Sequence, residues 1–167
     1  MDLAIIYGPS ADLHLAIQNL GRDRIVAVGP RGSGLAKKKQ VALDWLLRQR
    51  LVLPSHSHGL RALIERAAAQ RKLKLDVQLE ADSFRVLTSL VEEGLGYSLL
   101  PPSSVRGEID ARRLEIAAIS GQAPMRELVI ASPVDHPDST ATSVITQLLR
   151  SETAACRSEG LWDIKLG

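Results

Sequence analysis

The chain has 167 residues, 45% of them hydrophobic and 24% charged, which is typical of a folded globular protein rather than a disordered one. The formal net charge of +2 is too small to indicate a nucleic-acid partner, and aromatic residues, at 3%, leave no platform for stacking bases. The single cysteine, Cys156, excludes an intrachain disulfide and a cysteine-cluster metal site.

The amino terminus, MDLAIIYGPS, has an acid at position 2 and only a short apolar run. A secretory signal needs a basic start and a longer apolar stretch. A membrane span needs about 20 apolar residues. We therefore expect a cytoplasmic protein that does not enter a membrane.

In the first third of the chain, short apolar runs that stop at Gly-Pro pairs or at polar turns predict strands. These strands are expected at 3–7, 25–28 and 51–53. Residues 13–20 fit either a strand or one short helix, and the glycine-rich, basic stretch 31–40 predicts an exposed loop. The apolar side provided by Trp45 and Leu46 predicts a helix over 41–50.

In the rest of the chain, apolar residues recur with helical spacing in three segments and alternate or run together in four others. We expect helices over 58–72, over 84–94 and from 139 to about 150, and strands at 76–80, 96–100, 114–119 and 127–131. The tail to residue 167 shows no strong period. Strands separated by helices indicate βαβ units and a largely parallel sheet.

The stretch LVLPSHSHGLR, residues 51–61, combines two histidines and two serines at the end of a predicted strand. As a zinc site, His56 and His58 would need a further protein ligand, and no other histidine shows partner spacing, so we expect no metal. As a catalytic site, Ser55 or Ser57 would be the nucleophile and His58 the base. The stretch lacks a G-x-S-x-G elbow, and neighbours on a tight turn seldom reach each other as a base requires.

A third interpretation fits the physical chemistry of this stretch better. Ser55 or Ser57 caps a helix that begins near His58, and the exposed first-turn amides form a partly positive cup for a carboxylate or phosphate. Ligands bind at such turns in open parallel sheets. A cap without a ligand remains the alternative. Asp82 and Ser83 form a second helix start with the same ambiguity.

Several segments, in order, resemble LysR-type transcriptional regulators. EADSFRVLTSLVEEGLGYSLLP (80–101) is similar to the family's strand, helix, G-x-G turn and strand ending in Leu-Pro. DLAI (2–5) resembles a strand of the first lobe, and IVAVGP (25–30) followed by Leu35 and Ala36 resembles the strand that crosses to the second lobe. LVLP (51–54), GLR (59–61) and MREL (125–128) are similar to the start of the second subdomain and to the return strand.

The resemblance covers residues 1 to about 150 and implies a periplasmic-binding-protein-like (type II) α/β fold of two lobes, with a small effector between them. It places 1–22 and 123–150 in lobe one, 23–122 in lobe two and 151–167 in a tail. The implied ligand positions are Tyr7, Ser132 and the turn residues Pro54, Ser55, His56, Ser57 and His58. The implied effector is a small anion, and no cofactor or enzymatic activity is expected.

A member of the family should begin with a winged helix-turn-helix, which is not found in this sequence, so we expect a chain truncated at its N-terminus with an incomplete first lobe. DNA would then be contacted only through the missing domain. The strand at residues 3–7 would have an unpaired edge, which predicts a dimer or higher oligomer. The alternatives are a transport receptor of the same fold and, third, a small hydrolase.

Overall fold

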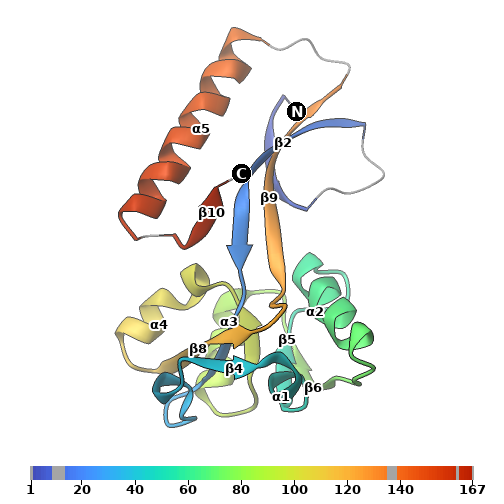
Figure 1. Ribbon diagram of the computed structural model, residues 1–167, viewed down its shortest axis with the longest axis vertical. Coiled ribbons are helices and arrows are strands. Elements are labelled where there is room, and N and C mark those ends of the chain that lie inside the picture. Colours follow the sequence, from blue (N-terminus) through green and yellow to red (C-terminus); the bar gives the residue numbers. More distant parts are fainter. Residues whose placement is uncertain (1, 9–13, 135–138, 161, 167) are drawn as a thin grey trace. The chain divides into compact units, whose positions relative to one another are not determined.

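The computed structural model describes residues 2–8, 14–134, 139–160 and 162–166. The chain divides into two compact units, and each is described by itself. Unit 1 comprises residues 1–23 and 126–167, and unit 2 comprises the uninterrupted stretch 24–125. Figure 1 shows the helices and strands of both units coloured along the sequence.

Unit 1 is a four-stranded sheet accompanied by one long helix. The sheet has the order β1-β9-β2-β10, and both β1 with β9 and β2 with β10 are antiparallel. Ser139 caps the helix by accepting a bond from the Thr142 amide, and Gly160, at a φ of 68°, follows its end. The elements are β1 (Ala4–Tyr7), β2 (Leu15–Arg24), β9 (Met125–Pro133), α5 (Thr140–Ser158) and β10 (Ile164–Leu166).

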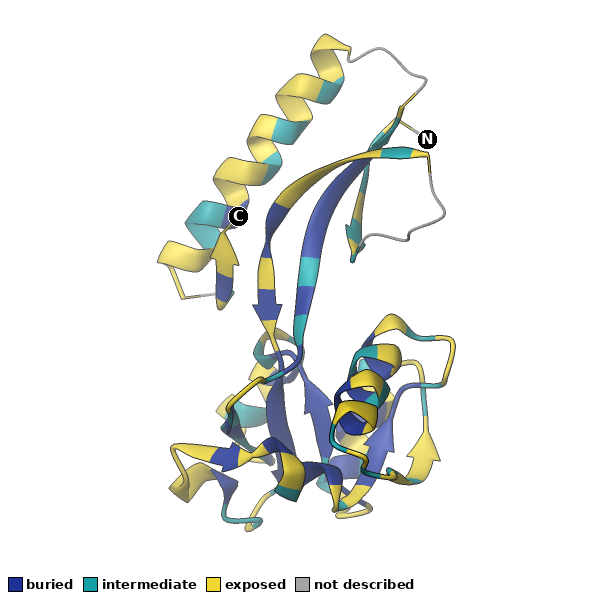
Figure 2. Ribbon diagram, turned by 45° about the vertical axis from the view of Figure 1, so that its right-hand side comes forward, coloured by how far each residue is buried: buried dark blue, intermediate teal, exposed yellow. Residues whose placement is uncertain are grey.

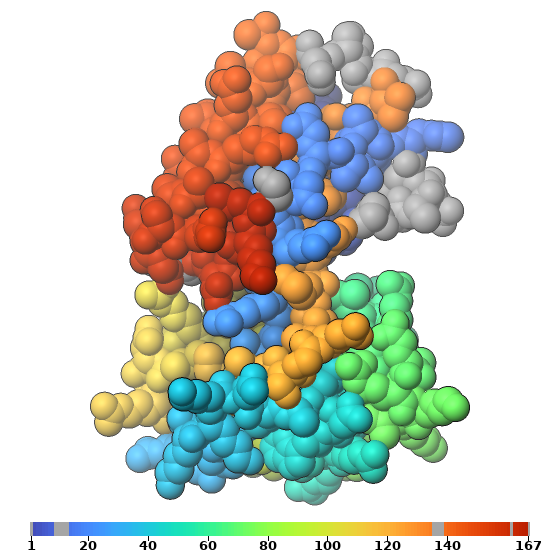
Figure 3. All heavy atoms as spheres, in the orientation of Figure 1, coloured from blue at the N-terminus to red at the C-terminus, as the bar shows by residue number. Residues whose placement is uncertain are grey.

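The core of unit 1 is small. Among the described residues, its hydrophobic cluster consists of Leu20, Leu128, Ile130 and Ile164, with Leu3, Leu149 and Trp162 packed against them. Most of α5 is exposed: its ribbon is mainly yellow in Figure 2, and its orange to red atoms are open to view in Figure 3. Three large apolar side chains of α5 are about half exposed: Val144, Ile145 and Leu148.

Unit 2 is an α/β layer with a larger core. Its main sheet has the order β4-β8-β3-β7, and two backbone bonds of Tyr97 connect β7 to the parallel pair β5-β6. Figure 2 shows the central strands in dark blue. The strands are β3 (Val26–Pro30), β4 (Gln40–Ala42), β5 (Arg50–Leu53), β6 (Asp76–Glu80), β7 (Ser98–Leu100) and β8 (Leu114–Ser120).

The helices of unit 2 bury their apolar stripes against these strands. Leu60, Ile64 and Ala68 recur on one side of α2, and Leu87 and Val91 form the buried stripe of α3. These side chains join Leu51, Leu53 and Leu99 of the strands in one core. The helices are η1 (Leu35–Lys37), α1 (Leu43–Leu47), α2 (Gly59–Gln70), α3 (Phe84–Glu92), η2 (Pro102–Val105) and α4 (Arg106–Asp110).

The expectation of a largely parallel sheet is wrong. β3 lies between β7 and β8 and is antiparallel to both, whereas β4 is parallel to β8 and β5 to β6. Alternation of strands and helices predicts parallel neighbours only where each helix connects strands that are adjacent in the sheet. In this chain β3 instead pairs with strands that follow it by about 70 to 90 residues.

Two expected segments also differ from the structure. The helix expected over 41–50 is limited to α1, because Val41 is paired with Ile119 in β4 and this strand delays the helix start. The final helix extends to Ser158, and the tail contains β10, whose Ile164 is buried in the unit 1 core. The ambiguous segment 13–20 is part of β2 from Leu15 onward.

Candidate functional site

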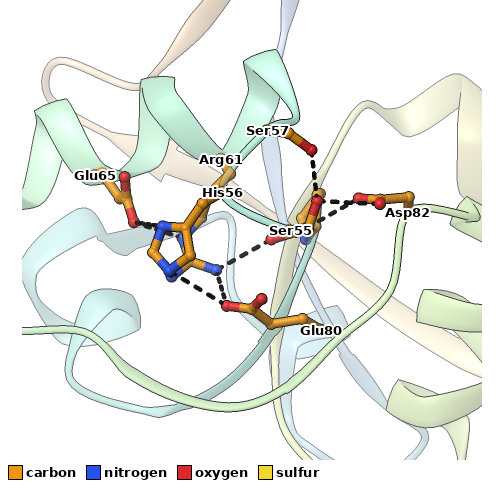
Figure 4. A network of polar contacts seen from close by, with 8 residues as sticks. Ser55, His56, Ser57, Arg61, Glu65, Glu80 and Asp82 are labelled. Carbon is orange, nitrogen blue, oxygen red and sulfur yellow. Dashed lines mark hydrogen bonds and ion pairs between the residues drawn. The ribbon is translucent and has the colours of Figure 1, made fainter.

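The candidate site lies where β5 and β6 end. These strands are parallel and paired, with Leu53 opposite Glu80, so the residues that follow them emerge at the same edge of the sheet. Pro54 is buried directly after β5, and residues 55–58 form the turn that leads into α2. Asp82 follows β6 just before α3. Figure 4 shows the two segments facing each other.

Ser55 binds the Asp82 carboxylate with two donors. Its backbone amide lies 3.0 Å from Oδ1 and its hydroxyl 3.0 Å from Oδ2. The Ser57 hydroxyl lies 3.0 Å from the Ser55 hydroxyl (Figure 4). The side-chain hydrogen bond from Ser55 first, and then the backbone hydrogen bond from Ser55, hold the pKa of Asp82 below its usual value. Asp82 therefore remains ionised in neutral solution.

His58, not a serine, caps α2. Its Nδ1 accepts the Leu60 amide at 3.1 Å, so the expectation that Ser55 or Ser57 provides this cap is wrong. The physical reason is that the hydroxyl of Ser55 is bonded to Asp82 instead. With Nδ1 acting as the acceptor, the neutral imidazole carries its proton on Nε2, and the ring lies 5.8 Å from that of Phe84.

The second expected cap is also corrected. Ser83 occupies the N-cap position of α3, but its side chain makes no capping bond. The carboxylate of Asp82 accepts its bonds from Ser55 rather than from the first turn of α3. Each of the two helix starts was expected to offer backbone amides to a ligand. In the structure, Ser55 before α2 instead donates to the carboxylate of Asp82 before α3.

His56 takes part in a different network. Its Nδ1 lies 2.9 Å from Glu65, and its Nε2 lies 3.2 Å from the terminal guanidinium nitrogen of Arg61. Arg61 is buried and donates to Glu65, to Glu80 and to the Pro54 carbonyl at 2.8 to 3.0 Å. The guanidinium thus ties α2 to the ends of both strands (Figure 4). Sequence reasoning missed Arg61, whose only signal was a charge at a helix position facing the core.

This network borders an open hollow of about 470 Å³ between α2 and β6. Its polar end is His56, Arg61, Glu65 and Glu80, and its floor is aliphatic. The two carboxylates are already bonded to Arg61, which limits what they can offer to a ligand. The aliphatic lining is Ala68, Ala69, Leu73, Leu75 and Val77.

Tyr7 and Ser132, the two expected ligand positions of unit 1, lie in different surroundings. Tyr7 ends β1, is half exposed, and has the Arg126 guanidinium 3.8 Å above its ring. Arg126 is buried and forms an ion pair with buried Asp23. Ser132 lies within the last part of β9, not after it, and borders a hollow of about 270 Å³ lined mainly by polar side chains of α5.

Other chemistries find little support in this geometry. Within the described ranges no three histidine, cysteine or carboxylate side chains are grouped so that they could hold a metal ion. His58 is a poor general base because its Nδ1 is occupied in the helix cap and its Nε2 carries the proton. No described helix is long and apolar enough to cross a membrane.

Comparisons with known proteins agree with this architecture. BbuR of Bordetella bronchiseptica, an HTH-type transcriptional regulator, is 26% identical over 160 residues, covering 96% of this chain and 49% of BbuR. The chain thus spans about half the length of this curated relative. The sequence model of the LysR substrate binding domain matches residues 1–154.

Two solved structures share the fold. The regulatory domain of CcmR from Synechocystis PCC6803, in complex with 2-PG, gives a TM-score of 0.80 at 22% identity over 91% of this chain and 73% of that chain. The effector binding domain of QuiR, in complex with shikimate, gives a TM-score of 0.78 at 19% identity over 92% of this chain and 72% of that chain. They confirm the periplasmic-binding-protein-like (type II) fold class. The chain belongs to the LysR substrate-binding domain family.

Proposed function

We propose that this chain is the effector-sensing domain of a LysR-type transcriptional regulator that acts in the cytoplasm. The observation that carries the proposal is the match of the LysR substrate binding domain over residues 1–154. The relative BbuR is named a transcriptional regulator, and this chain corresponds to about half of it. DNA contact is accordingly assigned to a helix-turn-helix domain outside these residues.

The proposed ligand is a small, anionic metabolite. CcmR and QuiR were solved with 2-PG and shikimate, and shikimate is a small carboxylate. The proposed contacts in unit 1 are Tyr7 and Ser132, both accessible to solvent. Those in unit 2 are the turn residues Pro54, Ser55, His56, Ser57 and His58.

The proposed mechanism requires no covalent chemistry and no cofactor. An effector that binds one conformation of the regulator more tightly than another shifts the population toward that conformation. A tenfold difference in affinity corresponds to about 1.4 kcal/mol of bias. The effector should leave the protein unchanged, so NMR of a bound and released metabolite should show no product.

The partner in assembly is proposed to be a second copy of this chain. β1 pairs only with β9 among the described strands, and its residues Ile5 and Tyr7 are about half exposed. An accessible strand edge with apolar side chains favours pairing with another chain.

The ligand proposal is tested by thermal-shift screening of the purified chain against small carboxylates and phosphates, followed by calorimetry on each compound that stabilises it. We expect Ser55→Ala to weaken binding by about tenfold, because a hydroxyl of the polar turn is lost. Ser89→Ala is the matched control and should bind normally, because Ser89 is an exposed serine of α3 whose hydroxyl donates to the Arg85 carbonyl of its own helix. Equal affinities of the two variants would exclude the turn as the ligand contact.

A further inference from the structure

The hydroxyl hydrogen bonds that link Ser57, Ser55 and Asp82 can be oriented in only one way. The Ser55 hydroxyl donates to Asp82 Oδ2, because an ionised carboxylate can only accept. The Ser55 hydroxyl has one proton, so in its 3.0 Å contact with Ser57 it must be the acceptor and Ser57 the donor. Both hydroxyl protons therefore point along one chain toward Asp82.

This direction leaves the side chains of the cluster with acceptors rather than donors. The Ser55 amide proton is also used, by Asp82 Oδ1, so Ser55 has no donor left for an incoming acid group. Each carboxylate oxygen of Asp82 accepts one bond from Ser55, and a carboxylate has about four acceptor positions in all. Asp82 is exposed, and its remaining lone pairs are accessible to a ligand.

The charge of the Asp82 side chain points the same way. Asp82 is ionised in neutral solution, and the two bonds from Ser55 hold its carboxylate in one orientation. Arg61, the buried cation of the neighbouring network, is bonded to Glu65, Glu80 and the Pro54 carbonyl instead (Figure 4). An acid group of an effector placed here would meet a fixed negative charge.

We propose that Asp82 is a specificity-determining residue that binds a hydrogen-bond donor group of the effector, a hydroxyl or an ammonium group, and excludes acid groups from this part of unit 2. The inference rests on the proposed function. An anionic effector remains compatible with it, because such a molecule can carry hydroxyl or ammonium groups as well as its acid group. Ser55 is then a positioning residue, and Asp82 makes the contact.

The test uses the whole 18.1 kDa chain, which suits amide NMR, and two minimal probes. Ethanolammonium carries both donor groups, and acetate carries the acid group. Each probe is titrated to about 100 mM at constant ionic strength, because weakly binding fragments approach saturation in this concentration range. We expect the amide signals of Ser55 and Ser57 to shift saturably with ethanolammonium and not with acetate.

Two variants make the test specific. Asp82→Asn removes the charge and keeps one acceptor oxygen for the Ser55 amide, so we expect about tenfold weaker ethanolammonium binding with the fold preserved. Asp76→Asn removes an exposed carboxylate at the opposite end of β6 and should bind as the parent does. The comparison of the two probes on the parent chain does not depend on how either variant folds.

The proposal is overturned if acetate shifts the Ser55 amide more than ethanolammonium does, if neither probe shifts it, or if Asp82→Asn leaves the ethanolammonium affinity unchanged. Failure of the proposed function looks different. In that case no metabolite stabilises the chain in the thermal screen. If a metabolite does stabilise it and binds Asp82→Asn equally well, only the inference about Asp82 fails.

Discussion

At the residue scale, the ion pair of Arg126 and Asp23 contributes to unit 1 by joining two neighbouring strands. Asp23 lies near the end of β2 and Arg126 near the start of β9, and both side chains are at least 95% buried. The guanidinium also stacks on Tyr7 of β1. A buried charge is costly unless it is paired, so removing either partner would leave the other buried without a counter-charge.

Replacing Arg126 with methionine should destabilise the chain by about 3–5 kcal/mol, because the Asp23 carboxylate is left buried without a counter-charge. Chemical denaturation measures this loss. The double variant Asp23→Asn with Arg126→Met removes both charges and should be more stable than Arg126→Met alone. A single variant that unfolds at the same denaturant concentration as the parent would contradict this role.

Glu115 of β8 stabilises the loop 31–36. Its carboxylate accepts bonds from the Gly32 amide at 2.9 Å, the Ala36 amide at 3.2 Å and the Ser33 hydroxyl at 3.1 Å. The Gly32 amide first, and then the Ala36 amide, lower the pKa of Glu115. A lowered pKa in the folded state means that this stabilisation is present above the ordinary value of 4.5 and is lost as the pH falls through the folded-state pKa.

Glu115→Gln should therefore reduce the stability at neutral pH by about 1 kcal/mol, a value that is modest because solvent reaches the group. The difference in Tm between parent and variant should shrink as the pH is lowered from 6 to about 3.5, since protonation removes the charge from the parent too. A difference that stays constant over this range would show that the carboxylate charge is not involved.

At the level of residues, the sequence predicted features within one short segment but not contacts between distant segments. The pattern PSHSH placed a polar turn at the end of a strand, and the structure has that turn. The pattern gave no information that Asp82 would bind Ser55, because this contact depends on the parallel pairing of β5 with β6 across 27 residues of sequence. Two helix starts that look independent in the sequence thus form one cluster.

At the element scale, the contact of the β7 segment with β5 depends on Gly96. The backbone of Tyr97 bonds to Arg50 and Val52, and a Cβ at position 96 would lie 2.7 Å from the Arg50 carbonyl oxygen. Backbone cannot move aside as a flexible side chain does. The glycine of the G-x-G turn therefore permits the strands to approach.

Gly96→Ala should cost about 2 kcal/mol of folding free energy through this overlap, measured by urea denaturation. Gly107→Ala in α4 is the control, because an added Cβ there meets no atom within 4 Å and alanine favours a helix. The control should be neutral or slightly stabilising. Equal stability of the two variants would mean that β7 can shift away from β5.

Elements with a clear period were predictable, and those that depend on distant partners were not. The stripes of α2 and α3 and the runs of β5, β6 and β8 are visible in the sequence and are confirmed. β4 was missed because its three residues form a strand only by pairing with β8, about 80 positions later. β10 was missed for the same reason, since its partner is β2.

At the scale of the whole molecule, the two units have unequal cores. Unit 2 buries a continuous cluster from Ile25 to Ile119, whereas the cluster in the described part of unit 1 has four buried residues. Apolar burial provides most of the stability of a folded unit, at about 25 cal/mol per Å². Unit 1 is therefore expected to unfold at lower denaturant concentration.

The two tryptophans allow this to be measured, since Trp162 lies in unit 1 and Trp45 in unit 2. Variants that keep one tryptophan and carry phenylalanine at the other position should report separate urea transitions, with Trp162 changing first. Coincident transitions for the two reporters would show that the units unfold as one cooperative body.

Assembly through the β1 edge is tested by light scattering over a range of protein concentrations. Ile5→Lys places a charge on the half-exposed edge strand and should shift the chain toward monomer. Leu79→Lys, the same kind of change at a similarly exposed apolar residue of the edge strand β6, is the control and should leave the mass unchanged. A parent chain that is monomeric at every concentration would contradict the proposal.

The chain leaves unit 1 at Asp23 and returns at Arg126, from two strands that lie next to each other in the sheet. The intervening stretch is continuous and has its own core, so it is a candidate for excision as a free-standing protein. The severed ends of the remainder could be sealed with a loop of about three to five residues, the usual length between adjacent strands. Transplanting the excised stretch into a related scaffold would then exchange the proposed ligand contacts of unit 2 and leave those of unit 1 in place.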